Sequence, residues 1–122
     1  MPGEMPELGT FAVTATLAPP SAAAPLDRLQ AEGVATLLHR ALSQAREAVG
    51  PDGSVITVMD RWVGTHPDGA MLAVVVTGSS AAFAEAAVRA LVEHILTTSA
   101  PLEGWRLSET EVRVGASARS GR

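Results

Sequence analysis

The spacing of apolar side chains along this chain switches between two residues and about 3.6 residues, and the order of these switches constrains the fold. Residues 10–18 place an apolar side chain at every second position, which predicts a strand that ends at Pro19-Pro20. Residues 27–49 then place apolar side chains three and four positions apart. This spacing predicts a helix that stops at the glycine–proline pair 50–51.

The rest of the chain continues the alternation. Strands are predicted at 55–63 and 71–77, joined by a hairpin loop at 64–69 that contains a Pro-Asp-Gly turn. A serine-capped helix follows, and a last strand covers about 105–114. This order predicts an α+β, ferredoxin-like βαββαβ fold, in which a four-stranded antiparallel sheet carries two helices on one face.

The length of 122 residues fits one domain, which we assign to residues 10–114. Residues 1–9 and 115–122 show no periodicity and are predicted to be flexible tails. The first seven residues lack the basic and apolar regions of a secretory signal, and no apolar run approaches the ~20 residues of a membrane span. We therefore expect a cytoplasmic protein that does not contact a membrane.

Composition narrows the chemistry that is open to the chain. Without cysteine it has no disulfide, no thiolate metal ligand and no cysteine nucleophile. A net charge of −4, evenly spread arginines and only two Phe and two Trp are atypical of a nucleic-acid-binding surface. His39 and His94 have no partner at a metal-ligand spacing, so we expect neither a metal nor another cofactor, and the roles of these two histidines stay open.

The two strands predicted at the centre of the sheet, 10–18 and 71–77, create an uncharged surface. If their larger apolar side chains face the helices, the opposite face carries only Thr, Ala, Met and Val. Such an extended apolar face seldom stays exposed, so we expect a second copy, another protein or a small ligand to cover it. A twofold homodimer is the commonest arrangement. The expected interface residues are Thr14, Thr16, Met71, Ala73 and Val75.

A second candidate site lies at the predicted hairpin. Because a histidine side chain can exchange a proton near neutral pH, His66 could act as acid or base. Asp60 could orient its imidazole, and Trp62 could enclose a small apolar ligand. A period of two places Asp60 and Trp62 on one side of their strand and Arg61 on the other. The structural alternative is a polar hairpin tip with a solvated Arg61.

Charged residues recur along the last predicted strand, where Glu109, Glu111 and Arg113 share a face. Two carboxylates that are buried together would indicate acid–base chemistry. On a strand near the edge of a sheet, we expect a solvated charged row that opposes pairing with another strand.

Two functions fit this sequence. The first is a small cytoplasmic, self-associating protein-interaction module without catalytic activity, which binds a partner through its sheet face or first helix. The alternative is a metal-free dimeric α+β-barrel enzyme, of the monooxygenase or cyclase kind, that acts on a small apolar metabolite with His66, Asp60 and Trp62. The chain offers no convincing set of acid, base and nucleophile, which favours the module.

Overall fold

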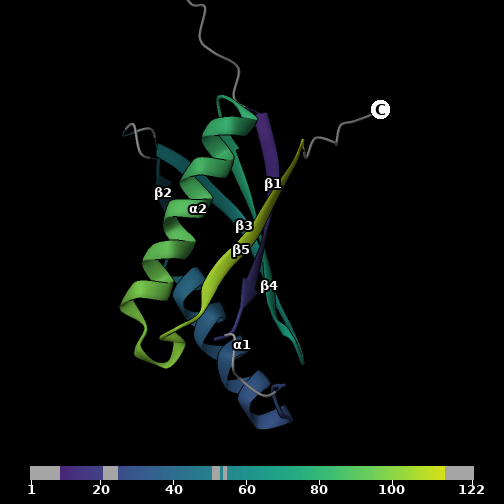
Figure 1. Ribbon diagram of the computed structural model, residues 1–122. Coiled ribbons are helices and arrows are strands. Elements are labelled where there is room, and N and C mark those ends of the chain that lie inside the picture. The colour runs from purple at the N-terminus through teal and green to yellow at the C-terminus, as the bar shows by residue number, and fades with distance from the viewer. Residues whose placement is uncertain (1–8, 21–24, 51–52, 54, 115–122) are drawn as a thin grey trace, which may run out of the picture.

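The computed structural model describes residues 9–20, 25–50, 53 and 55–114 (Figure 1). It is an α+β structure with two α-helices and one five-stranded antiparallel sheet. The tails predicted at 1–9 and 115–122 lie outside the described residues, except that Gly9 begins the first strand. Neither described α-helix has the length and hydropathy needed to cross a bilayer. In chain order the elements are β1 (Gly9–Ala18), α1 (Arg28–Ser43), β2 (Glu47–Val49), β3 (Val55–His66), β4 (Gly69–Gly78), α2 (Ala81–Thr98), the 3₁₀ helix η1 (Ala100–Leu102) and β5 (Arg106–Val114).

The strands lie in the order β2-β3-β4-β1-β5, and every neighbouring pair is antiparallel. The predicted four-stranded ferredoxin-like arrangement is therefore not confirmed, because the sheet has a fifth strand at its edge. The helix predicted at 27–49 ends at Ser43, and Glu47–Val49 pairs with the start of β3 instead. Three residues are too few to show a period of two, and the edge of β3 supplies backbone hydrogen-bond partners that local spacing does not record.

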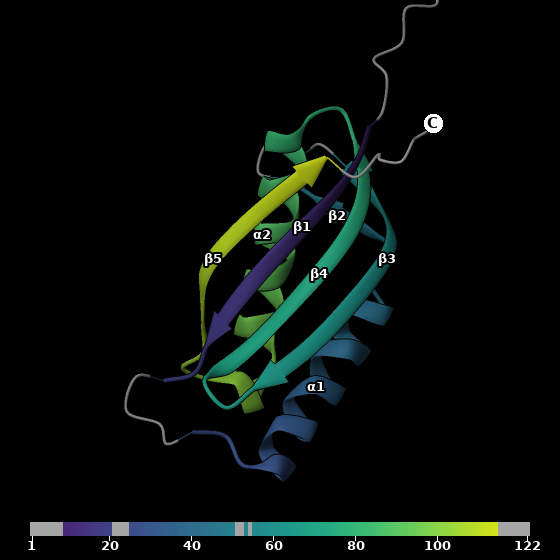
Figure 2. The same ribbon diagram turned by 90° about the vertical axis from the view of Figure 1, so that its right-hand side faces the viewer.

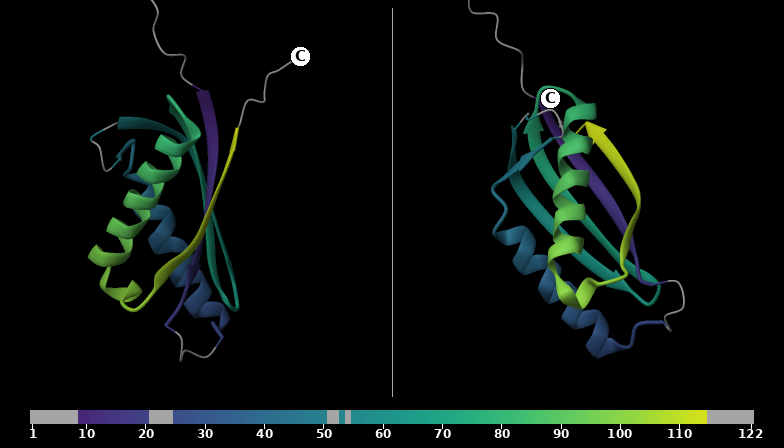
Figure 3. Two further views of the ribbon diagram at one scale, coloured as in Figure 1. Left: turned by 45° about the horizontal axis from the view of Figure 1, so that its top comes forward. Right: turned by 60° about the vertical axis from the view of Figure 1, so that its left-hand side comes forward.

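Both α-helices lie on one face of the sheet, and no described element covers the other face (Figures 1 and 2). α2 runs over the sheet and contacts all five strands, whereas α1 lies beside it and packs mainly against β3 (Figure 3). Each long strand therefore turns one row of side chains toward the helices and the other toward solvent.

The hydrophobic core lies between α2 and the sheet, and it follows the predicted alternation. The large inward side chains of β1 and β4 are buried, as predicted, and they are Phe11, Val13, Leu17, Leu72, Val74 and Val76. α2 places Ala84, Ala87, Val88, Val92 and Ile95 against them. Ser80 caps α2, because its Oγ accepts the N–H of Phe83 at 3.1 Å.

α1 buries a narrower stripe than its spacing predicts. Asp27 and Gln30 form a capping box at its start: the Asp27 Oδ1 accepts the N–H of Gln30 at 2.8 Å, and the reciprocal bond is 3.0 Å long. Only Leu38 and Leu42 of this helix are buried, whereas Leu37, expected to face the sheet, is half-buried. α1 lies beside α2 and packs mainly against β3, so Val34, Leu37 and Ala41 reach the core but stay partly exposed.

The hairpin between β3 and β4 is tighter than predicted. Most of the loop expected at 64–69 is strand, because β3 continues to His66 and β4 begins at Gly69. Gly69 has a φ of 154°, and a Cβ at this position would overlap the backbone carbonyl of Leu17. Only glycine can close the turn in this place.

Candidate functional site

The open face is the side of the sheet that no described helix covers (Figure 2). Strand register arranges its side chains in rows that cross β3, β4, β1 and β5 in that order. Row one is Asp60, Val75, Ala12 and Arg113; row two is Trp62, Ala73, Thr14 and Glu111; row three is Gly64, Met71, Thr16 and Glu109. The two middle positions of each row are uncharged, and they include all five interface residues expected from the sequence. The β5 position of each row is charged, as the alternation of the last strand predicts.

Trp62 is the large apolar side chain at the β3 margin of the open face. It is 55% exposed, and its indole lies over Gly64, where any Cβ would collide with the ring. A β-bulge at Met59 sets this orientation, because the register of β3 shifts between Val58 and Asp60. Val58 therefore faces the core, while Trp62 faces away from it. A half-exposed tryptophan beside an uncharged surface is typical of a binding interface.

The three residues predicted for catalysis do not converge. Asp60 and Trp62 lie on one side of β3 and Arg61 on the other, as predicted, and the side of Asp60 and Trp62 is the open face. His66 lies six residues beyond Asp60 on the same strand, so the Cα atoms are about 20 Å apart at ~3.3 Å per residue. The structure therefore does not bring the carboxylate and the imidazole together. A catalytic role for His66 stays a prediction.

Arg61 is half-buried between β3 and the end of α1, and it does not lie at a solvated hairpin tip. Its Nη2 donates to the carbonyl of Ala45 at 3.3 Å, one residue beyond the helix C-cap Gln44. Its Nε is buried and has no hydrogen-bond partner within the described part of the chain. A cation at a helix C-terminus stabilises the last carbonyls and the helix dipole, so Arg61 ties α1 to the sheet.

We expect Arg61→Met to lower the free energy of unfolding by about 1–2 kcal/mol, because methionine keeps the packing of the side chain but loses the bond to Ala45. Urea unfolding followed by circular dichroism measures the loss. Arg106→Met is the control, since Arg106 is exposed at the start of β5, and it should change stability by less than about 0.5 kcal/mol. Equal losses in the two variants would contradict a role for Arg61 at the helix end.

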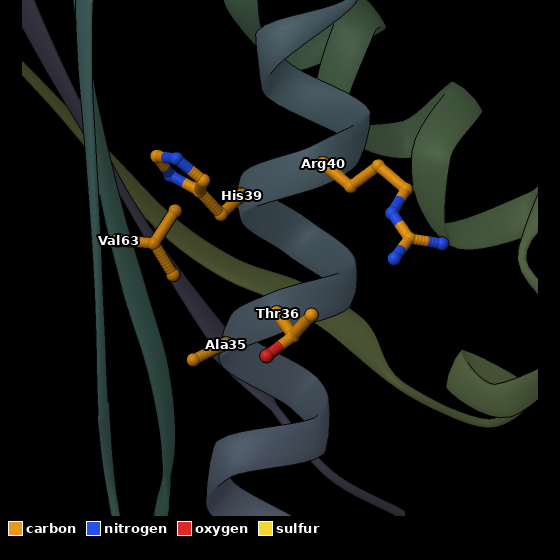
Figure 4. Close-up of a pocket in the computed structure, with 5 residues that line it drawn as sticks. All are labelled: Ala35, Thr36, His39, Arg40 and Val63. Carbon is orange, nitrogen blue, oxygen red and sulfur yellow. The ribbon is translucent and has the colours of Figure 1, made fainter.

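An open cavity of about 430 Å³ lies between α1 and β3 (Figure 4). Its lining residues are Ala35, Thr36, His39, Arg40 and Val63. In Figure 4 the His39 ring extends toward Val63, whereas the Arg40 guanidinium points to the other side of the helix. The two polar groups diverge and do not converge on one ligand.

A second cavity, of about 420 Å³, separates the first half of α1 from η1. Leu37 and Trp105 line it together, and Gln30 supplies its polar side chain. The sequence does not predict this groove, because it joins residues about 70 positions apart and no local spacing records such a contact. Its lining holds no carboxylate, imidazole or hydroxyl group to act as acid, base or nucleophile.

Histidine and carboxylate side chains are dispersed over the described ranges, where no three of them gather to hold a metal ion. His39 lies on α1 and His94 on α2, and both are exposed. The open face, with its uncharged middle positions and half-exposed Trp62, is therefore the candidate site. No protein-family model, no curated protein and no solved structure matches the chain.

Proposed function

We propose that this chain is a small cytoplasmic module without catalytic activity, which associates with a second copy of itself through the open face. One observation carries the proposal: the middle positions of all three rows are uncharged, and no described element covers them. The charges of this face lie at its margins, on β5 and at Asp60 of β3. An interface core depleted of charge within a polar rim is the usual layout of a protein–protein contact.

The size of the open face supports a stable dimer. Four strands spaced about 4.8 Å apart and roughly 33 Å long present about 600 Å² in projection, and the relief of the side chains adds to this area. A standard interface buries about 800 Å² on each partner. Together with that relief, the open face approaches the area of a specific contact.

A second copy is the occupant that best fits this face. Homodimers with a twofold axis are the commonest oligomers, and they need only one self-complementary surface. The alternative function, a metal-free enzyme, depends on Asp60 and His66 acting together, and their separation along β3 gives it no support. We therefore propose self-association, and not catalysis, as the function of this chain.

The first test is the mass of the particle in solution. One chain has a mass of 12.5 kDa, and light scattering at ~50 µM should report twice that value, because standard interfaces hold at micromolar concentration or below. Dilution should also shift the tryptophan emission to longer wavelength as Trp62 returns to water, and Trp62→Phe should abolish that shift. A particle of 12.5 kDa at this concentration would refute the proposed function.

A further inference from the structure

The charges of row one on the open face are complementary to those of a second copy that faces it with its strand order reversed. Row one begins with a negative charge on β3 and ends with a positive charge on β5, with two apolar residues between them. A twofold axis that runs parallel to the strands, between two facing sheets, reverses the strand order of the second copy and keeps each row at its own level. Asp60 then lies opposite Arg113 of the partner subunit, and Val75 lies opposite Ala12 of the partner subunit.

We propose that two copies pair face to face about this axis, with an ion pair between Asp60 and Arg113 of the partner subunit on each side of an uncharged centre. The inference rests on the proposed self-association and specifies which residues of the two copies meet. Because each subunit contributes one partner to each pair, the dimer contains two such ion pairs.

The same axis matches large side chains with small ones. Val75 of one copy faces Ala12 of the partner subunit, and in row three Met71 faces Thr16 of the partner subunit. In row two, Trp62 faces Glu111 of the partner subunit, whose carboxylate can accept the indole N–H. Alternation of large and small residues across facing sheets is what dense packing requires.

A twofold axis across the strands would be unfavourable. Placed along row two, it would stack β5 on β5 of the partner subunit and set Glu111 against Glu111 of the partner subunit, although Glu109 would then face Arg113 of the partner subunit. Like charges that face each other across an interface cost several kcal/mol. The axis parallel to the strands sets no like charges against each other in the three rows, so the charge pattern favours it.

The geometry of packed sheets permits the ion pair. Facing sheets cross at about 30°. Asp60 and Arg113 of the partner subunit lie ~7 Å from the axis, so this angle shifts them along the strands by roughly 4 Å relative to each other. An arginine side chain can span that distance. Arg113 Nη2 now lies 3.8 Å from Glu111 Oε2, but these side chains are 78% and 61% exposed. Such an exposed pair contributes little, so Arg113 can exchange it for Asp60 of the partner subunit at small cost.

Two charge reversals test the pairing, and both positions are exposed. Asp60→Arg sets two arginines against each other in each pair, and Arg113→Asp sets two aspartates against each other. Each variant should raise the dimer dissociation constant at least about tenfold in sedimentation equilibrium at low salt. Asp60→Asn removes the charge without adding repulsion and should have a smaller effect.

Mixing the two reversal variants is the decisive experiment. In a mixed dimer every pair joins opposite charges, so an equimolar mixture should form dimers with a dissociation constant near the wild-type value. Native mass spectrometry should identify them as heterodimers. The double variant Asp60→Arg/Arg113→Asp should also recover wild-type affinity. Circular dichroism of each variant confirms that it is folded.

The outcomes separate this inference from the proposed function. A mixture that stays monomeric, or single variants with wild-type affinity, would overturn the pairing of Asp60 with Arg113 of the partner subunit. A wild-type chain that is itself monomeric would instead refute the proposed self-association. Glu93→Arg is the control, because it reverses a carboxylate on the exposed side of α2, and it should leave the dimer unchanged.

Discussion

The Val75→Glu variant should be a folded monomer. Val75 occupies a middle position of row one, between Asp60 of β3 and Ala12 of β1, and lies at the centre of the proposed contact. A carboxylate at this position would be desolvated in the dimer, with no cation opposite it. Because each copy contributes one, the dimer would bury two such carboxylates. An uncompensated buried charge costs about 3–5 kcal/mol, so the two together should raise the dissociation constant by roughly a thousandfold or more.

Light scattering at matched concentrations measures this effect, and far-UV circular dichroism shows whether the fold persists. Val114→Glu is the matched control: Val114 is 72% exposed on β5 and pairs with the inward Phe11, so it lies on the helix side of the sheet. This control should remain dimeric. If Val75→Glu kept the wild-type mass, the open face would not be the interface.

Leu38→Ala should reduce the free energy of unfolding by about 2–5 kcal/mol, because the side chain is completely buried and leaves a cavity. Its two neighbours serve as controls on the same helix turn. Leu37→Ala should cost less, since Leu37 is half-buried, and His39→Ala should stay within about 0.5 kcal/mol because His39 is exposed.

Urea unfolding of the three variants measures these differences, and the protein concentration must be the same throughout, because association stabilises the folded chain. The expected order of losses is Leu38 first, Leu37 second and His39 last. A larger loss for Leu37 than for Leu38 would mean that α1 is rotated about its axis relative to the described structure.

Local spacing is sufficient to predict the two central strands. β1 and β4 alternate without interruption, so their inward and outward side chains follow from the sequence alone. The same regularity predicts the uncharged middle of the open face. It fails for α1, because Ala45 and Val49 also fit a helical spacing although the helix has already ended at Ser43.

The predicted catalytic group depended on a loop that the structure does not contain. The prediction placed His66 in a loop over 64–69, close to Asp60. Instead β3 stays extended to His66, because its backbone pairs with β4 as far as Gly69. An extended strand separates residues that are six apart by about 20 Å, whatever their chemistry.

The sequence by itself determined the alternation of β1 and β4, the capped starts of both α-helices and the charged outward row of β5. Each of these features depends only on residues that are close together in the sequence. Only the tertiary structure decided that Glu47–Val49 forms an edge strand and that Trp62 lies on the open face. Continued alternation from Ile56 and Val58 would have turned Trp62 toward the core. The bulge at Met59 exchanges the sides to which the following residues of β3 point. It depends on the register of the hydrogen bonds between β3 and β4, and the local sequence of β3 does not record that register.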